Sequence, residues 1–181
     1  MAYKSSPRPD FDAPTPIPYS AVTRHLWGDA AAGFVDDWIY VSSMQIHQLL
    51  FGLPPGGAFR HSPDYRTVFA ADETLTVLSG TMILSNPETG EVVPVRTGET
   101  AFFRRDTWHH AFAWGTEELR VLEYFAPPPA TGTSGAYAKT KPYVDQPRYD
   151  RPGMIGAFTG TLTPGTIRVI GEGDRLWSLD P

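Results

Sequence analysis

The segment ETLTVLSG, residues 73–80, shows most directly what kind of fold this chain adopts. It combines β-branched residues, which strands favour, with a final Ser-Gly pair that is typical of turns. Side chains point to alternate faces along a strand, so Glu73, Leu75 and Val77 share one face. The segment therefore predicts a strand whose apolar face carries one carboxylate.

Short segments of the same kind lie on both sides of it, between Trp38 and Ala126, separated by Gly- and Pro-rich breaks. They are WIYVS, MQIHQLLFG, RTVFA, TMILS, EVVPV, TAFFRR, WHHAFAW and ELRVLEYFA. No helical segment separates them, which favours an antiparallel sandwich or barrel over β-α-β units. The predicted fold class is therefore all-β.

Size and composition limit the classes of function. The 181 residues (20.0 kDa) are 41% hydrophobic and 13% aromatic, enough for the core of one domain. The net charge of −5 disfavours a nucleic-acid surface, and no apolar run approaches the length of a membrane span. The chain has no cysteine, and its start lacks a hydrophobic signal segment, so we expect a cytoplasmic protein without disulfides.

The two ends differ from the strand-rich centre at residues 38–128. Residues 1–37 contain five prolines between Ser5 and Tyr19, which predicts an extended arm, either disordered or laid over a neighbouring subunit. A short helix, ending near Gly33, or a loop is expected between Tyr19 and Phe34. Residues 129–181 combine a Pro/Gly-rich connector with a hairpin of segments 166–170 and 175–179, within the same domain.

Three motifs follow one another in the strand-rich centre: PPGGAFRH (54–61), ETLTVLSG (73–80) and GETAFFRRDTWH (98–109). Glu73 is followed by Gly80 after six residues, and His109 comes eleven positions after Gly98. With this spacing the chain resembles the cupin superfamily over roughly residues 44 to 127. The resemblance implies a jelly-roll β-barrel with a site for a small molecule.

The chain departs from the cupin motifs at several positions. Only His61 precedes Glu73, because Thr67 and Phe69 stand where the family's His-x-His pair is expected. In the last motif and its continuation, other residues replace the family's Pro, Gly and Asn, namely Arg104, Asp106 and Ala113.

Glu73 and His109 are the candidate reactive pair. An inward carboxylate and imidazole on neighbouring strands are costly to bury unpaired, so they either bind a metal or hydrogen-bond each other. The small side chains of Ala111 and Ala113, on the same face as His109, leave room for a ligand cavity. Trp108, His110, Phe112 and Trp114 then face outward as an apolar patch, which favours a homodimer or coverage by the arm.

If His61 also turns inward, then His61, Glu73 and His109 form a set of two imidazoles and one carboxylate. This set suits a divalent metal with open positions, Fe²⁺ foremost and Zn²⁺, Mn²⁺ or Ni²⁺ as other options. The alternative is a metal-free pocket in which burial raises the pKa of Glu73, so that it acts as a general acid or base.

Other side chains are candidates for the pocket. Glu123 alternates with Val121 and Phe125, so it is either a second acid/base group or further ligand inside the barrel, or an ordinary solvent-facing residue. His47 is a candidate for orienting substrate, and Arg60 for capturing a carboxylate unless it is solvated. The candidate walls are aromatic: Phe59, Phe69 and Phe103.

The leading hypothesis is a metal-dependent enzyme that acts on a small organic substrate, carboxylated or aromatic, by dioxygenase-type chemistry. Two alternatives stay open: a metal-free binding or accessory protein, and a metal-free isomerase or epimerase. We expect neither nucleic acid nor membrane as a partner.

Overall fold

The computed structural model of the chain describes residues 8–60, 62, 67–69, 71–89 and 91–126, together with two strands at 138–140 and 167–170. In these residues the chain forms strands and one short 3-10 helix, η1 (Tyr19–Ala21). The predicted all-β class is therefore confirmed. In the described part of the chain, no helix is long and apolar enough to span a bilayer.

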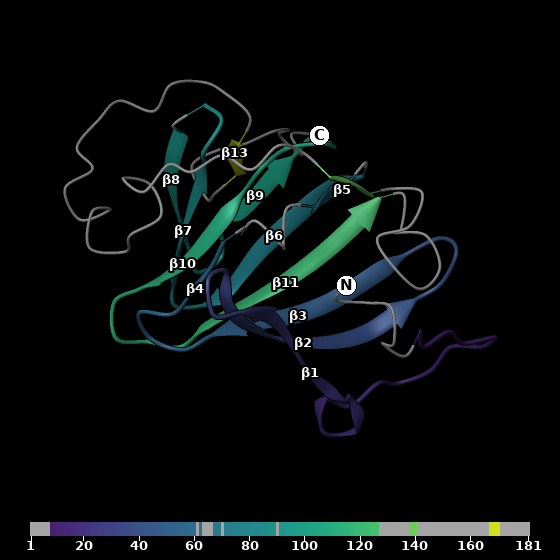
Figure 1. Cartoon of the computed structure of the whole chain (residues 1–181). Coiled ribbons are helices and arrows are strands. Elements are labelled where there is room, and N and C mark those ends of the chain that lie inside the picture. The colour runs from purple at the N-terminus through teal and green to yellow at the C-terminus, as the bar shows by residue number, and fades with distance from the viewer. Residues whose placement is uncertain are drawn as a thin grey trace, which may run out of the picture.

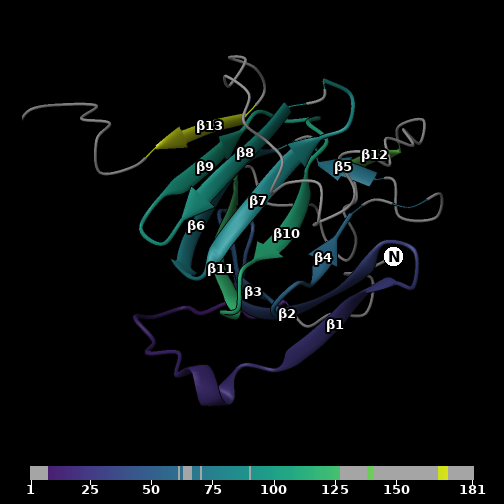
Figure 2. The same cartoon turned by 90° about the vertical axis from the view of Figure 1, so that its left-hand side faces the viewer.

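Two main antiparallel sheets face each other (Figures 1 and 2). The larger has seven strands in the order β1 (Arg24–Asp29), β2 (Gly33–Ser42), β3 (His47–Leu53), β11 (Leu119–Ala126), β6 (Asp72–Ser79), β9 (Thr100–Phe103) and β13 (Ile167–Ile170). The smaller has four strands in the order β4 (Ala58–Phe59), β10 (His110–Trp114), β7 (Thr81–Asn86) and β8 (Glu91–Arg96). A third sheet pairs β12 (Ala138–Thr140) with β5 (Thr67–Phe69).

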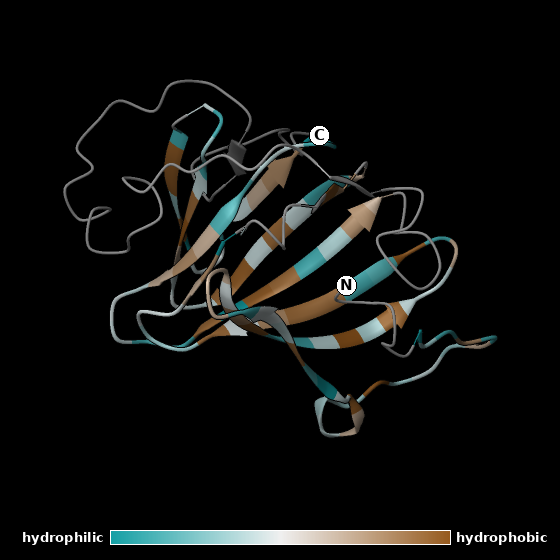
Figure 3. Ribbon diagram, viewed as in Figure 1, coloured by the Kyte–Doolittle hydropathy of each residue, from teal (hydrophilic) through white to brown (hydrophobic). Residues whose placement is uncertain are grey.

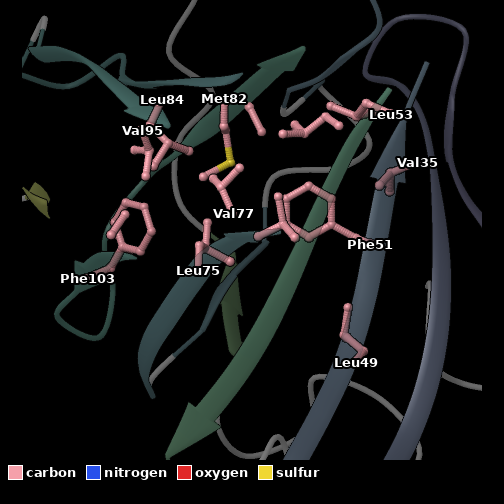
Figure 4. Packing of buried hydrophobic residues seen from close by; sticks show 14 of the residues in the cluster. Val35, Leu49, Phe51, Leu53, Leu75, Val77, Met82, Leu84, Val95 and Phe103 are labelled. Atoms are coloured by element: carbon pink, nitrogen blue, oxygen red, sulfur yellow. The ribbon is translucent and has the colours of Figure 1, made fainter. Parts of the chain in front are cut away.

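The core lies between the two main sheets and follows the alternation of each strand (Figure 3). On β6 the side chains of Glu73, Leu75 and Val77 are buried and those of Thr74 and Thr76 are half-buried, as the sequence predicts. Figure 4 shows side chains of β6 and β7 meeting across this layer, with Met82 beside Val77. Burial of this apolar surface is the main force that holds the sheets together.

The Ser-Gly turn signal after β6 is used as predicted. Gly80 has a φ of +79°, a conformation that side chains with a Cβ rarely adopt. A Cβ at this position would also lie 3.0 Å from the carbonyl oxygen of Glu118. Gly80 therefore lets the chain turn directly from β6 in the large sheet into β7 in the small one.

The helix in the segment between Tyr19 and Phe34 is limited to η1, and the rest of the segment, where the sequence also allowed a helix up to Gly33, forms the β1–β2 hairpin. The turn contains three consecutive alanines, which favour helices, but the side chain of Asp29 stabilises a turn at this point instead. Its Oδ1 accepts hydrogen bonds from the backbone N–H groups of Ala31 (2.7 Å) and Ala32 (2.6 Å). Asp side chains favour turns through such bonds.

The described part of the N-terminal arm lies against its own chain, which differs from both predicted alternatives. The backbone N–H of Ser42 donates to the carbonyl of Pro9 at 2.7 Å. The ring of Tyr19 lies 5.6 Å from that of Trp38, over which the Arg120 guanidinium sits at 4.4 Å. The arm therefore covers the outer face of the large sheet near its edge.

The apolar patch expected outside β10 is mostly buried within one chain. Phe112 is fully buried beside Ile83 and Val92, and Trp114 is 39% exposed. This removes the main argument for the homodimer, which stays a prediction. At the C-terminus β13 pairs with β9, whereas the second half of the predicted hairpin lies outside the described residues.

The packing between the sheets predicts which leucine stabilises the fold. Leu84 on β7 is fully buried, whereas Leu78 on β6 is 50% exposed. We expect Leu84→Ala to lower the free energy of unfolding by about 2–5 kcal/mol, because it leaves a cavity, and Leu78→Ala by less than about 1 kcal/mol. Urea denaturation of both variants measures this, and equal effects would contradict the described core.

Candidate functional site

Two carboxyl groups meet on the inner face of the large sheet. Strands β6 and β11 are neighbours, with Glu73 opposite Phe125 and Leu75 opposite Glu123. Glu73 and Glu123 are therefore diagonal neighbours on one face, and their buried carboxyl groups are hydrogen-bonded to each other. Since an ionised carboxylate only accepts hydrogen bonds, one of the two must hold a proton.

His109 joins this carboxyl pair from the turn between β9 and β10. Its Nε2 lies 3.3 Å from Oε1 of Glu73, and its ring stacks on Phe103 with 4.5 Å between centroids. The preceding turn is held where the Asp106 N–H donates to the carbonyl of Phe69 at 2.6 Å. Asp106 has a φ of +66°, which fits its place in the motif, because the family has Gly there. The predicted contact between Glu73 and His109 is therefore present.

Burial determines the protonation of this cluster. It raises the pKa of Glu73 to about 7, although the hydrogen bond from Glu123 opposes this rise. The pKa of Glu123 lies well above its ordinary value because of burial first and the charge of Glu73 second. Burial lowers the pKa of His109, against the opposing effects of the Glu123 charge and a hydrogen bond with the Thr107 backbone. Near neutral pH the cluster thus holds a shared proton.

Glu123 and His109 face a cavity with about 50 Å³ of water-accessible space. Ala111 also lines it, as its small side chain predicts. Most of the described wall is apolar, and five aromatic rings contribute to it, those of Trp27, Phe51, Phe59, Phe69 and Phe125. Glu73 contacts both polar groups but lies behind them, outside the described lining. The arrangement presents an acid and an imidazole to an apolar ligand space.

Asp37 on β2 also lines the cavity, and the sequence analysis did not single it out. Its side chain is 3% exposed, between Val35 and Ile39 on the inner face of the strand. The signal for it was the alternation in FVDDWI, residues 34–39, which places one of the two consecutive acids inside. The strand expected from the sequence begins at Trp38, so Asp37 lies just before it.

The aromatic residues predicted as walls are all near the site. Phe59 and Phe69 line the cavity, where Phe59 lies 4.6 Å from the Trp27 ring and Phe69 meets Phe125 edge-on at 4.8 Å. Phe103 instead supports His109 from behind by stacking.

Two predicted pocket residues lie elsewhere, which corrects their placement. His47 is on the inner face but sits behind Phe125, where its Nδ1 is 2.8 Å from Oγ of Ser42. Burial lowers the pKa of His47 to about 4, with a smaller effect from the charge of Arg8. The Arg60 side chain runs along the β1–β2 turn, where its Nε donates to the carbonyl of Ala31 at 3.0 Å. Neither is in the described lining of the cavity.

His61, the third predicted metal ligand, lies outside the described residues. Among those that are described, no three His, Asp or Glu side chains are arranged to hold a metal ion. Phe69, at the place of a family histidine, adds an aromatic ring to the wall instead of an imidazole. The described residues therefore do not by themselves complete the predicted metal centre.

Solved structures with this fold include several of low sequence identity. The polyketide cyclase RemF from Streptomyces resistomycificus has a TM-score of 0.54 and 16% identity, over 81% of this chain and 95% of its own. A predicted oxalate decarboxylase from Thermotoga maritima has a TM-score of 0.51 and 18% identity, over 61% of this chain and 97% of its own. The oxalate decarboxylase from Bacillus subtilis has a TM-score of 0.50 and 15% identity, over 74% of this chain and 33% of its own.

Sequence comparison with families agrees with these structures. No protein with a curated description matches the chain. The sequence profile described as "Cupin domain" matches residues 49–125, which run from β3 to β11 and contain Glu73, His109 and Glu123. The jelly-roll barrel implied by the motifs is thereby confirmed. Residues 49–125 therefore form a cupin domain.

Proposed function

We propose that the chain is an enzyme that transfers protons within a small ring-containing substrate, using Glu123, His109 and Glu73. The observation that carries this proposal is the pair of hydrogen-bonded carboxyl groups, in contact with an imidazole, at the edge of an aromatic cavity. The cupin fold and the cavity support the broader role of binding or converting a small molecule.

The contacts provide a complete path for the proton. With a carbonyl substrate in the cavity, neutral His109 takes a proton from the carbon next to the carbonyl, while Glu123 donates its proton to the carbonyl oxygen. The product is an enol, and the cluster is left with a proton on His109 instead of Glu123. His109 touches Glu73 at 3.3 Å, and Glu73 is hydrogen-bonded to Glu123, so the proton can return to Glu123 through Glu73.

Two features of the cavity favour this chemistry. A pKa near 7 lets Glu73 accept and release protons at neutral pH, where acid–base catalysts work best. The largely apolar walls lower the polarity around the ion pair that His109 and Glu123 form when the proton moves, which strengthens its electrostatic interactions. Glu73 acts here as a positioning and relay residue, because it lies behind the groups that face the ligand.

A divalent metal is the second candidate for the centre of this site. It is favoured by the 3.3 Å contact between Glu73 and His109, the two described residues among the ligands that the cupin motifs name. Both would bind the ion, and His61, which lies outside the described residues, would be the third ligand. A bound Fe²⁺ would supply the oxygen activation that dioxygenase chemistry requires.

Proton transfer is tested by exchange of substrate hydrogen for deuterium in D₂O, followed by proton NMR. The probes are small ring ketones such as cyclohexanone and 1-indanone. We expect exchange with the wild-type protein and a roughly 10²- to 10⁴-fold lower rate with Glu123→Gln, because the acid is removed. Glu118→Gln, at a 49% exposed carboxyl, is the matched control and should leave the rate unchanged. An unchanged rate in Glu123→Gln, or no exchange by the wild type, would contradict the proposal and favour a binding role.

The raised pKa of Glu73 predicts how stability depends on pH. Between about pH 4.5 and 7 folded Glu73 holds a proton that the unfolded chain releases, so rising pH disfavours folding. The lowered pKa values of His47 and His109 act in the opposite direction, so the wild type must be compared with Glu73→Gln. We expect the variant to gain about 3 kcal/mol in unfolding free energy relative to wild type across this range.

Urea denaturation at several pH values measures this difference. Glu118→Gln, which removes an exposed carboxyl, should show almost none of it. A difference between Glu73→Gln and wild type that does not change with pH would show that Glu73 ionises as an ordinary exposed carboxyl.

Metal analysis of protein purified without chelator separates the two candidate centres. A metal centre predicts stoichiometric Fe, Mn, Ni or Zn, lost in His109→Ala, Glu73→Gln and His61→Ala while folding is retained. The proton-transfer site predicts deuterium exchange that persists after dialysis against chelator. Loss of exchange on chelation, with recovery on adding back one metal, would overturn the metal-free form of the proposal.

A further inference from the structure

Phe103, the last residue of β9, is a neighbour of both members of the Glu73–His109 contact. In the pairing of β6 with β9 it lies directly opposite Glu73, so the two side chains share a face of the sheet. Its ring is 1% exposed and belongs to the core between the two main sheets (Figure 4). The ring of His109 stacks on it, with 4.5 Å between centroids and 26° between the ring planes. One aromatic residue is therefore the cross-strand neighbour of Glu73 and the stacking partner of His109.

The turn before His109 holds the backbone but does not set the direction of the imidazole. The Arg105 N–H donates to Oδ1 of Asp72 at 3.0 Å, which ties the turn to the start of β6. Strand β10 begins at His110, so His109 precedes the strand and its side chain is not oriented by the pleat. Contacts of the ring itself must therefore limit rotation of the imidazole.

A contact on the face of the imidazole can do this, because the hydrogen bonds of the ring lie in its plane. Stacking on Phe103 fixes that plane and leaves the edge of the ring open to polar partners. In this plane Nε2 of His109 lies 3.3 Å from Oε1 of Glu73, and the side chain also lines the cavity. Phe103 is described but is not part of the cavity lining, so it acts on His109 and not on a ligand.

The same contact favours the charge that His109 acquires in the proposed reaction. The face of an aromatic ring attracts a cation, and the attraction is stronger where both groups are shielded from water. The Phe103 ring therefore stabilises the imidazolium that forms when His109 takes the proton from the substrate carbon. An aliphatic side chain of similar size would fill the space without this effect.

We infer that Phe103 is a positioning residue, which holds the imidazole of His109 in one orientation against Glu73 and stabilises it while it carries the proton. The second half of this inference rests on the proposed function, in which His109 is the base. The orientation of the imidazole is a property of the protein without substrate, so the two halves can be measured separately.

The orientation of His109 is tested by NMR on the full chain near neutral pH, without substrate. Long-range proton–nitrogen spectra distinguish the two tautomers of the imidazole, and the ring-current shift of its protons reports stacking on Phe103. We expect one tautomer and upfield-shifted protons in the wild type. Phe103→Leu should show mixed tautomers and no such shift, because the released ring leaves its contact with Glu73. The signals that disappear in His109→Ala assign the residue.

Phe102→Leu is the matched control, since it removes a half-buried ring from the opposite face of β9, where Phe102 lies opposite Thr74. Phe103→Tyr, which retains a ring, should keep the wild-type spectrum. Thermal unfolding checks that Phe103→Leu is folded, and Phe103→Met, with its flexible apolar chain, serves if it is not. The inference is overturned if wild-type His109 shows no ring-current shift, if loss of the Phe103 ring leaves the tautomer unchanged, or if Phe102→Leu changes the spectrum equally.

Deuterium exchange measures the effect on the reaction, with the ring ketone that the wild type exchanges fastest. Phe103→Leu should lower kcat by about 3- to 30-fold, as expected for loss of a buried contact between a cation and an aromatic ring. KM should stay unchanged, because Phe103 does not face the ligand. An unchanged kcat, or a rise in KM alone, would overturn the role of Phe103 in the reaction.

The two proposals fail separately in this design. If the wild type exchanges no ketone but the tautomer of His109 depends on Phe103, the proton-transfer function is wrong and the positioning of the imidazole holds. If exchange depends on Glu123 but Phe103→Leu changes neither the spectrum of His109 nor kcat, the proton-transfer function holds and the positioning role is wrong.

Discussion

The hydrogen bond between the carboxyl groups of Glu73 and Glu123 is the interaction on which the site depends. Burial of two acids is tolerable only when they do not both ionise, and a shared proton meets this condition. The imidazole of His109 is a third polar group in contact with the pair, in a layer that is otherwise apolar. Near neutral pH the pair therefore holds one proton at the edge of the cavity, as the proposed acid–base chemistry requires.

The sheet order explains why this interaction is stable. Both carboxyls stand on interior strands of the large sheet, β6 and β11, which pair with each other and with β9 and β3 on their other sides. A shift of one residue in this pairing would move the acid of the shifted strand to the outer face, together with the apolar neighbours on that strand, and separate it from the other acid. The packing of the core therefore fixes the register of the two strands. The positions of the two carboxyl groups depend in this way on the packing of neighbours such as Leu75 and Val121.

Alternation along strands allowed much of this arrangement to be predicted from the sequence. It places Glu73 and His109 inside, and the motif spacing brings the two together. For Glu123 it left both the barrel interior and solvent open, and the pairing of β11 with β6 places this residue inside. It did not predict the hairpin closed by Asp29, where a local interaction overrides propensity, and the strand expected from Trp38 onward stopped short of Asp37. Alternation shows that a side chain faces the interior, but it does not show whether that side chain reaches the cavity. Access to the cavity depends on neighbours that are distant in sequence, as where the Phe125 ring lies next to His47 and lines the cavity in its place.

Phe69 links the departures from the cupin motifs to the chemistry of the cavity. Where the motifs place a histidine, this chain has a ring that lines the wall and meets Phe125. An imidazole there would add a metal donor, whereas a phenyl ring adds apolar surface and excludes water from Glu123. Lower polarity raises the cost of ionising both acids and so favours the shared proton. The phenylalanine at this position therefore weakens the resemblance to a metal site and favours the proposed acid–base site.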